Sequence, residues 1–417
     1  MTQGTTDDGA LVEQPEVTPL REPAAGVPAV VATPAAYREA VERLAAGTGP
    51  VAVDAERASG YRYGQRTYLV QVRREDVGTV LLDPVPFDDL HELGEALGDA
   101  EWVLHAATQD LPGLADLGMR PARVFDTELA ARLLGYERVG LGAVVAHVLG
   151  LGLAKEHSAQ DWSTRPLPED WLRYAALDVE LLVPLRDHLL GELAEQGKAE
   201  WAAQEFEAER LAPPAPPRVD PWRRTSGSPA LRDRRRQAVV RALWEARDAN
   251  ARLRDLSPGR VLPDRAIVAA AQALPRNVAD LTRLPEFATK GAKRRAPVWQ
   301  RAISEALALP ADELPSLRGP GTDAPPPARA WADRDPAAWA RLEIARPLVA
   351  EIAADHHLPT ENLLQPDALR RLCWTPPDPF TAGTVADFLR GRAAREWQVG
   401  LVAGPLAEAL GGAARGA

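Results

Sequence analysis

The chain has 417 residues, 46% of them hydrophobic and 26% charged, and a formal net charge of −10. This composition is ordinary for a globular protein, and the length exceeds what one hydrophobic core usually organises, so we expect two or three domains. The single cysteine, Cys373, excludes an intramolecular disulfide. Neither a secretory signal nor an apolar run of roughly 20 residues is present, which favours a cytoplasmic protein.

The first half of the chain alternates between strand and helix signals. Residues 1–30 are rich in Thr, Pro and acidic residues, have no usable period and are predicted to be disordered. Apolar or β-branched runs predict strands at 51–55, 67–72, 79–82 and 102–105, and helical periods predict helices at 126–134 and 171–190. This order indicates an α/β domain over residues 31–210, in which the first three strands could form a meander.

Two proline-rich breaks divide the rest of the chain. Residues 211–227 and 309–336 are expected to be linkers, and the apolar spacing in residues 228–308 and 337–411 predicts two small all-helical domains. The stretch from Arg218 to Arg260 holds twelve arginines against five acidic residues. A local basic face could bind phosphate although the whole chain is anionic, because exposed charges more than about 10 Å apart are largely screened. The alternative is an ordinary solvated surface.

Acidic residues near the ends of predicted strands are the first candidates for chemistry. Asp54 and Glu56 end the first predicted strand, where residues i and i+2 point to the same face, so both carboxylates can reach one metal site. Asp110 follows the fourth predicted strand and opens a helix, where a helix-capping acid is the simpler interpretation. Tyr174 and Asp178 are four residues apart on a predicted helix, so they stand side by side, which alone often means only a local hydrogen bond.

Together these residues predict a metal site. Four converging carboxylates would repel one another and have raised pKa values unless cations sit among them. Oxygen ligands suit Mg²⁺ or Mn²⁺, whereas the chain lacks the His and Cys spacing typical of zinc sites. Two such ions stabilise the attacking and leaving oxygens in phosphodiester hydrolysis, and a tyrosine hydroxyl could orient the attacking water.

The ordered set Asp54-x-Glu56, Asp110 and Tyr174-x-x-x-Asp178 resembles the three exonuclease motifs of the DEDD superfamily, tyrosine-containing branch. The flanking segments 160–167 (QDWSTRPL) and 125–130 (FDTELA) are similar to the ribonuclease D family. The resemblance implies a ribonuclease-H-like α/β fold, two divalent metal ions, and release of nucleoside 5′-monophosphates from RNA 3′ ends. It also implies that Asp54, Glu56, Asp110 and Asp178 are metal ligands and that Tyr174 positions the attacking water.

One departure from the superfamily pattern lies just before the second motif. Ala106 and Gln109 stand where the wider superfamily often has Asn and an aromatic residue, so substrate contacts in that stretch are in doubt while the metal site is intact. Lys155, Trp162 and Arg165 are candidates for structural or substrate support. For Trp162 and Arg165 we expect packing and bracing rather than direct contact with substrate.

The predicted helical domains resemble the HRDC domain that ribonuclease D shares with certain helicases. Residues 228–308 carry this pattern, and residues 337–411 match it more weakly. In that family such domains assist nucleic-acid binding. We therefore expect that neutralising Arg234, Arg235 and Arg236 together weakens RNA binding and flattens its salt dependence.

The predicted function is a 3′→5′ exoribonuclease that trims single-stranded RNA 3′ ends, such as those of tRNA precursors. Two alternatives stay open: a 3′→5′ DNA exonuclease of the same superfamily, and a catalytically idle nucleic-acid-binding scaffold. Comparing the trimming of matched RNA and DNA substrates distinguishes the predicted exoribonuclease from a DNA exonuclease. A rise in the unfolding midpoint on adding metal would favour an intact metal site over an idle scaffold. Neither a Gly-x-Ser-x-Gly nucleophile elbow nor a Gly-x-Gly-x-x-Gly dinucleotide motif is present to support another enzyme class.

Overall fold

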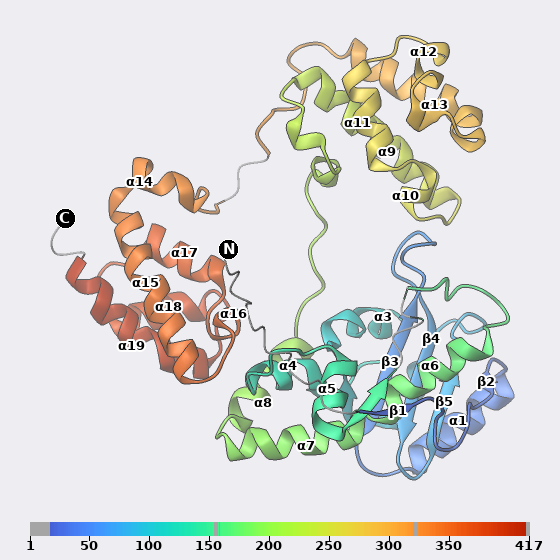
Figure 1. The fold of residues 1–417 in the computed structure, drawn as a ribbon, viewed down its shortest axis with the longest axis vertical. Helices are drawn as coiled ribbons and strands as arrows, with labels where there is room; N and C mark the ends of the chain where they lie inside the picture. The colour runs from blue at the N-terminus through green and yellow to red at the C-terminus, as the bar shows by residue number, and fades with distance from the viewer. Residues whose placement is uncertain (1–16, 154–156, 158, 320–322, 414–417) are drawn as a thin grey trace, which may run out of the picture.

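The computed structural model describes residues 17–153, 157, 159–319 and 323–413 (Figure 1). Within these residues the chain forms an α/β domain followed by two groups of helices. None of the helices in this part of the chain is both long and apolar enough to cross a membrane.

A six-stranded mixed sheet forms the centre of the α/β domain. Its strands, in spatial order, are β2 (Val30–Val31), β5 (Gly78–Leu82), β4 (Thr67–Arg74), β3 (Val51–Arg57), β6 (Glu101–Leu104) and β7 (Arg123–Asp126). The strands β3, β4 and β5 pair antiparallel and form the predicted meander. β6 joins β3 in parallel, β7 joins β6 in parallel, and β2 is parallel to β5. The α/β class expected from the sequence is confirmed.

Helices cover both faces of the sheet, which explains why β3 begins with apolar residues on both sides. They are α1 (Pro34–Ala46), α2 (His91–Leu97) and α3 (Leu111–Asp116) on one face, and α6 (Glu169–Glu180) and α7 (Leu182–Glu195) on the other. Val51 and Val53 are fully buried against the first set. Because side chains alternate along a strand, Ala52, Asp54 and Glu56 face α6 and α7.

Two parts of the α/β domain differ from the sequence prediction. β1 (Thr18–Leu20) lies in the tail that was predicted to be disordered, and it pairs in parallel with β8 (Leu151–Leu153). This pairing joins segments far apart in the sequence, so local composition does not reveal it; residues 1–16 lie outside the described part of the chain. The helix predicted at 171–190 is two helices, because α6 ends before Leu181 and α7 begins after it.

The first helical group, residues 234–308, has a core of its own. Its helices are α9 (Arg234–Leu253), α10 (Pro258–Val261), α11 (Asp264–Ala273), α12 (Val278–Thr282) and α13 (Lys290–Ala308). Leu243, Phe287 and Trp299 are fully buried between them. This group contacts the α/β domain through residues 58–66, the loop that joins β3 to β4. In Figure 1 the first helical group lies beyond the end of the sheet from which this loop extends. There the Tyr63 hydroxyl donates a hydrogen bond to Asp248 at 3.1 Å.

The second helical group, residues 331–413, shares a core with the α/β domain. Its helices are α14 (Trp331–Arg334), α15 (Pro336–Asp355), α16 (Thr360–Leu363), α17 (Pro366–Trp374), α18 (Ala382–Arg390) and α19 (Glu396–Ala413). The Trp397 ring stacks on Trp201 of α8 (Ala199–Arg210), with centroids 4.8 Å apart. The Glu205 carboxylate accepts hydrogen bonds from Trp397 Nε1 at 3.0 Å and from Arg395 Nη2 at 2.5 Å. These contacts dock the C-terminal helices on the α/β domain.

Candidate active site

The five residues singled out from the sequence line one cleft where β3 faces α6. The cleft has a volume of about 470 Å³, and its lining includes Asp54, Glu56, Asp110, Tyr174 and Asp178. In the sequence these residues belong to three separate motifs. The fold brings the motifs together because α6 packs directly on β3.

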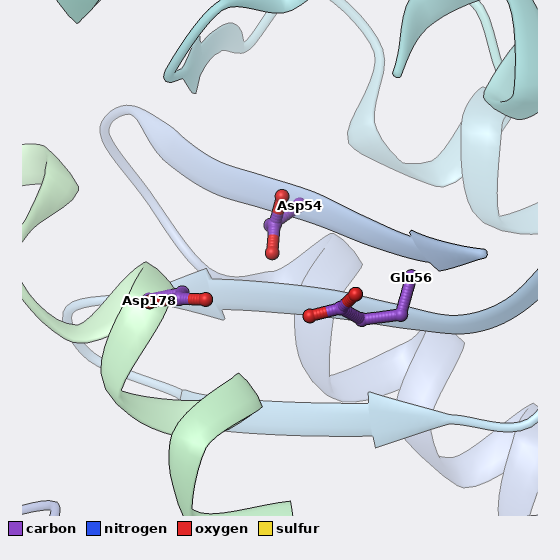
Figure 2. A group of neighbouring side chains, drawn as sticks. All are labelled: Asp54, Glu56 and Asp178. Carbon is purple, nitrogen blue, oxygen red and sulfur yellow. The ribbon is translucent and has the colours of Figure 1, made fainter. Parts of the chain in front are cut away.

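Asp54, Glu56 and Asp178 form a compact acidic group. One carboxylate oxygen from each residue lies within 4.8 Å of the other two. Asp54 and Glu56 project from the same face of β3, and Asp178 reaches them from α6. Figure 2 shows the three carboxyl groups turned toward one another.

Asp110 lies beside this group. It precedes α3, yet its side chain makes no capping hydrogen bond, so the helix-capping interpretation does not explain it. Its carboxylate is close enough to Asp54 for each to influence the ionisation of the other. It also forms an ion pair with Arg57, in which Oδ1 and Nη2 are 3.3 Å apart. Asp110 is therefore the fourth carboxylate of the cleft and, like Glu56, is buried.

Tyr174 stands one helical turn before Asp178 on α6. Burial raises the pKa of its phenol, and the negative charges of Asp178 and Glu56 raise it further. The hydroxyl therefore keeps its proton at neutral pH and can donate a hydrogen bond.

The four carboxylates share surroundings that oppose their ionisation. Burial is the largest cause and raises the pKa values of Asp54, Glu56, Asp110 and Asp178, that of Asp110 to about 8. Negative neighbours raise three of these pKa values further, with the Asp54 charge acting on all three. A hard divalent cation binds carboxylate oxygens and favours their ionised form, so this donor set fits a divalent metal site.

Arg57 belongs to the cleft although the sequence analysis did not select it. Regular alternation would place it on the face opposite Glu56. However, the pairing of β3 with β4 shifts register between Glu56 and Arg57. The guanidinium pairs with Asp110 and donates a hydrogen bond to the carbonyl oxygen of Gln109. The sequence signal was only a basic residue next to an acidic one, which is common on solvated surfaces.

Asp126 shapes the turn that presents Asp110, a role that sequence reasoning missed. Its carboxylate accepts hydrogen bonds from the backbone N–H groups of Ala106 at 3.0 Å and Ala107 at 2.6 Å. It also accepts two from the start of α4 (Thr127–Leu133). Ala106 has a φ of 59°, a left-handed conformation that costs a non-glycine residue roughly 1–2 kcal/mol. The Asp126 hydrogen bonds help to stabilise this turn.

Trp162 and Arg165 pack and brace the α/β domain, as expected. Trp162 is fully buried. Arg165 donates hydrogen bonds to both carboxylate oxygens of Asp83, from Nε at 2.6 Å and from Nη2 at 2.7 Å, and to the Tyr68 carbonyl oxygen at 2.8 Å. The third candidate, Lys155, lies outside the described residues.

Arg165→Met should lower the free energy of unfolding by about 3 kcal/mol, because it leaves the buried Asp83 carboxylate without its charge partner. Denaturant unfolding measures this loss, and nuclease activity of the folded variant should be unchanged. Arg173→Met is the matched control: its two partners, Glu22 and Glu169, are exposed, so the loss should be within about 1 kcal/mol. Equal losses for the two variants would contradict the bracing role.

Comparisons with known families match three parts of the chain. A family described as 3′-5′ exonuclease matches residues 28–194, within the α/β domain. The HRDC domain matches residues 236–303, within the first helical group. Residues 324–410, which include most of the second helical group, match a separate family described as 3′ to 5′ exonuclease C-terminal domain.

Similar proteins cover most of the chain. Ribonuclease D of Gluconacetobacter diazotrophicus is 32% identical over 334 residues, which are 78% of this chain and 81% of the relative. A crystal structure of a protein from Bifidobacterium adolescentis is 42% identical, with a TM-score of 0.85 over 95% of this chain and 100% of that one. The structure of Escherichia coli RNase D, 24% identical, has a TM-score of 0.64 over 89% of this chain and 98% of that one. These similarities confirm the expected fold.

Proposed function

Because the chain belongs to the ribonuclease D family and is a 3′→5′ exoribonuclease, we propose that it trims the 3′ ends of structured RNA such as tRNA precursors. The observation that supports the proposed site is the convergence of Asp54, Glu56, Asp110 and Asp178 in one cleft. A protein that only binds nucleic acid gains nothing from gathering, in one cleft, four carboxylates whose charges repel one another. A metal-dependent nuclease needs such a donor set.

We assign the four carboxylates as the residues that would hold two divalent ions, Mg²⁺ or Mn²⁺. When bound, such ions lower the pKa of a coordinated water and stabilise negative charge on the phosphate and the leaving oxygen. In the proposed reaction, a water oxygen bonds to the phosphorus of the last phosphodiester and the P–O3′ bond breaks. The attacking water gives up one proton, the departing O3′ takes one up, and a nucleoside 5′-monophosphate is released.

Tyr174 and Arg57 would support this reaction in different ways. The Tyr174 hydroxyl, which keeps its proton, donates a hydrogen bond that orients the attacking water. A phenol with a raised pKa is a poor base at neutral pH, so its role is orientation rather than proton abstraction. Arg57 holds the Asp110 carboxylate at the edge of the acidic group.

The proposed substrate is a structured RNA with a single-stranded 3′ extension. The E. coli relative is described as an exoribonuclease involved in structured RNA processing, and it shares the fold of this chain. The two helical groups extend beyond the α/β domain and offer further surface to an RNA body (Figure 1). A single-stranded 3′ extension that leaves a folded RNA would enter the cleft first.

The test uses a tRNA precursor with a 3′ extension, the extension alone as RNA, and the same extension as DNA. The full-length protein should shorten both RNAs from the 3′ end and slow near the acceptor stem of the precursor. Trimming of DNA as fast as RNA would overturn the RNA assignment. Rapid trimming of the free extension without action on the precursor would overturn the structured substrate.

A further inference from the structure

Five basic residues gather where the end of α9 meets the start of α13 in the first helical group. They are Arg254, Lys290, Lys293, Arg294 and Arg295. α13 packs antiparallel on α9, because Arg235 near the start of α9 donates a hydrogen bond to the carbonyl oxygen of Leu309, just after the end of α13; Arg254 therefore lies beside the start of α13. In agreement with this placement, burial lowers the pKa of Arg295, and the positive charges of Arg254 and Arg294 lower it further. We refer to the five residues as the basic cluster.

No carboxylate in the described parts of the chain forms an ion pair with any member of the basic cluster. Three other arginines of the same helical group are paired: Arg247 with Asp264, Arg252 with Asp248 and Arg283 with Asp280. Single exposed arginines such as Arg265 also lack an ion pair with a described residue, so the feature that distinguishes the basic cluster is the grouping of five cations. Protein surfaces usually mix charges of both signs, because like charges in proximity repel one another. An unpaired cationic surface in a chain of net charge −10 therefore indicates an anionic ligand.

The basic cluster adjoins the contact between the first helical group and the α/β domain. Asp255, the residue after Arg254, accepts a hydrogen bond from Tyr63 N at 3.2 Å. Nearby, Arg260 Nε donates to the Gly60 carbonyl oxygen at 2.9 Å. Tyr63 and Gly60 lie in the loop that continues from β3, the strand that carries Asp54 and Glu56. The basic cluster therefore lies at the end of the first helical group that faces the α/β domain (Figure 1). An extended anionic ligand bound along the cluster would lie at the same end.

An exposed apolar side chain accompanies the charge. Leu253 is 85% exposed although it directly precedes Arg254. Single-stranded nucleic acid offers both a phosphate backbone and unpaired bases, and its binding sites combine cations with side chains, mostly aromatic, on which bases stack. An acidic protein segment would use the cations but would have less use for an exposed leucine beside them.

Two arginines at the start of α9, Arg234 and Arg235, already donate hydrogen bonds within the protein. Arg234 Nη2 donates to the Leu314 carbonyl oxygen at 2.5 Å, and Arg235 donates to the carbonyl oxygen of Leu309. These bonds hold the segment that follows α13 against α9. The structure therefore does not favour the expectation that Arg234 and Arg235 form the RNA-binding face.

We propose that the basic cluster binds the phosphate backbone of single-stranded RNA upstream of the 3′ end that occupies the active site. This proposal rests on the proposed function for the identity of the ligand. It assigns the salt-dependent part of RNA affinity to Arg254, Arg294 and Arg295, with Lys290 and Lys293 at the margin. The 3′-terminal nucleotides are then bound by the active site alone.

The test compares Arg254→Gln/Arg294→Gln/Arg295→Gln with the control Arg232→Gln/Arg265→Gln/Arg276→Gln in the full chain. The control removes three exposed charges near or within the same helical group but outside the cluster. Affinity for a single-stranded RNA of about 20 nucleotides is measured against salt in the Asp178→Asn background, which prevents degradation. The cluster variant should bind about tenfold more weakly and lose about 2 from the slope of log affinity against log salt, whereas the control keeps both.

A second readout separates this proposal from the proposed function. When Asp178 is kept, the cluster variant should need about tenfold more of the long RNA to reach half of its maximal rate. It should hydrolyse an RNA dinucleotide, which is too short to reach the cluster, at the wild-type rate. An unchanged salt slope, or an equal loss in the control variant, would overturn the proposal. Equal loss on the dinucleotide would overturn it too. If the wild type binds through the cluster but trims no RNA, the proposed function fails while this inference stands.

Discussion

Replacing Asp178 by Asn should lower the rate of RNA hydrolysis at saturating substrate by roughly 10³-fold or more without unfolding the protein. The substitution keeps the shape of the side chain but removes one of three carboxylates whose oxygens lie within 4.8 Å of one another. Stabilisation of transition-state charge by a bound metal is worth several kcal/mol, and each 1.36 kcal/mol is tenfold in rate. Release of nucleoside monophosphate at several metal concentrations measures the loss.

Asp187→Asn is the matched control for this variant. Asp187 is exposed on α7 and pairs only with its neighbour Arg186 among the described residues, so the same chemical change there should leave the rate unaltered. Thermal unfolding of both variants checks that they are folded. An Asp178→Asn protein with near wild-type activity would remove this residue from the metal site.

Without divalent metal, the protein should become less stable as the pH rises from about 5 to about 8. Burial and like charges raise the pKa of Asp110 to about 8, and the pKa values of Glu56 and Asp178 are raised as well. A carboxyl group with a raised pKa in the folded state favours folding while it is protonated. That contribution is complete below the unfolded pKa and is lost as the pH passes through the folded pKa. The loss should be on the order of a few kcal/mol.

Divalent metal should reverse this trend. Mg²⁺ or Mn²⁺ replaces the bound protons, so the rise in Tm on adding metal should be larger at about pH 8 than at about pH 5. Asp110→Asn should show a flatter pH dependence and a smaller metal response than the wild type, because Asn does not titrate. Comparing the Tm of the two proteins at each pH removes the contribution of titratable groups elsewhere in the chain, because both proteins share them. A wild-type Tm that is insensitive to both pH and metal would contradict a metal site here.

The sequence was sufficient to identify the strand and helix that meet at the candidate site. The alternation rule places Asp54 and Glu56 on one face of β3, and helical periodicity places Tyr174 above Asp178 on α6. Both rules depend only on local geometry, and the structure has both arrangements. The roles of these residues as metal ligands and water-orienting group stay a prediction that the variants above test.

The remaining features depend on contacts between distant segments. Arg57 lies in the cleft because the pairing of β3 with β4 shifts register after Glu56, and no residue pattern in the sequence predicts this shift. Asp126 acts through the backbone of Ala106, which lies on a different element. For the same reason, the sequence does not predict the docking of Trp397 on Trp201 or the contact between Tyr63 and Asp248. Composition and periodicity describe each segment by itself and carry no information on which segments pack together.

The most direct test of the metal-dependent exoribonuclease mechanism follows single-stranded RNA labelled at its 5′ end over time, with Mg²⁺, Mn²⁺ or EDTA. We expect a ladder of products that shortens from the 3′ end one nucleotide at a time with either metal. EDTA should abolish it, as should Asp178→Asn. A ladder that persists in EDTA, or cleavage at internal positions, would contradict the mechanism, as would the absence of any trimming by the metal-loaded wild type.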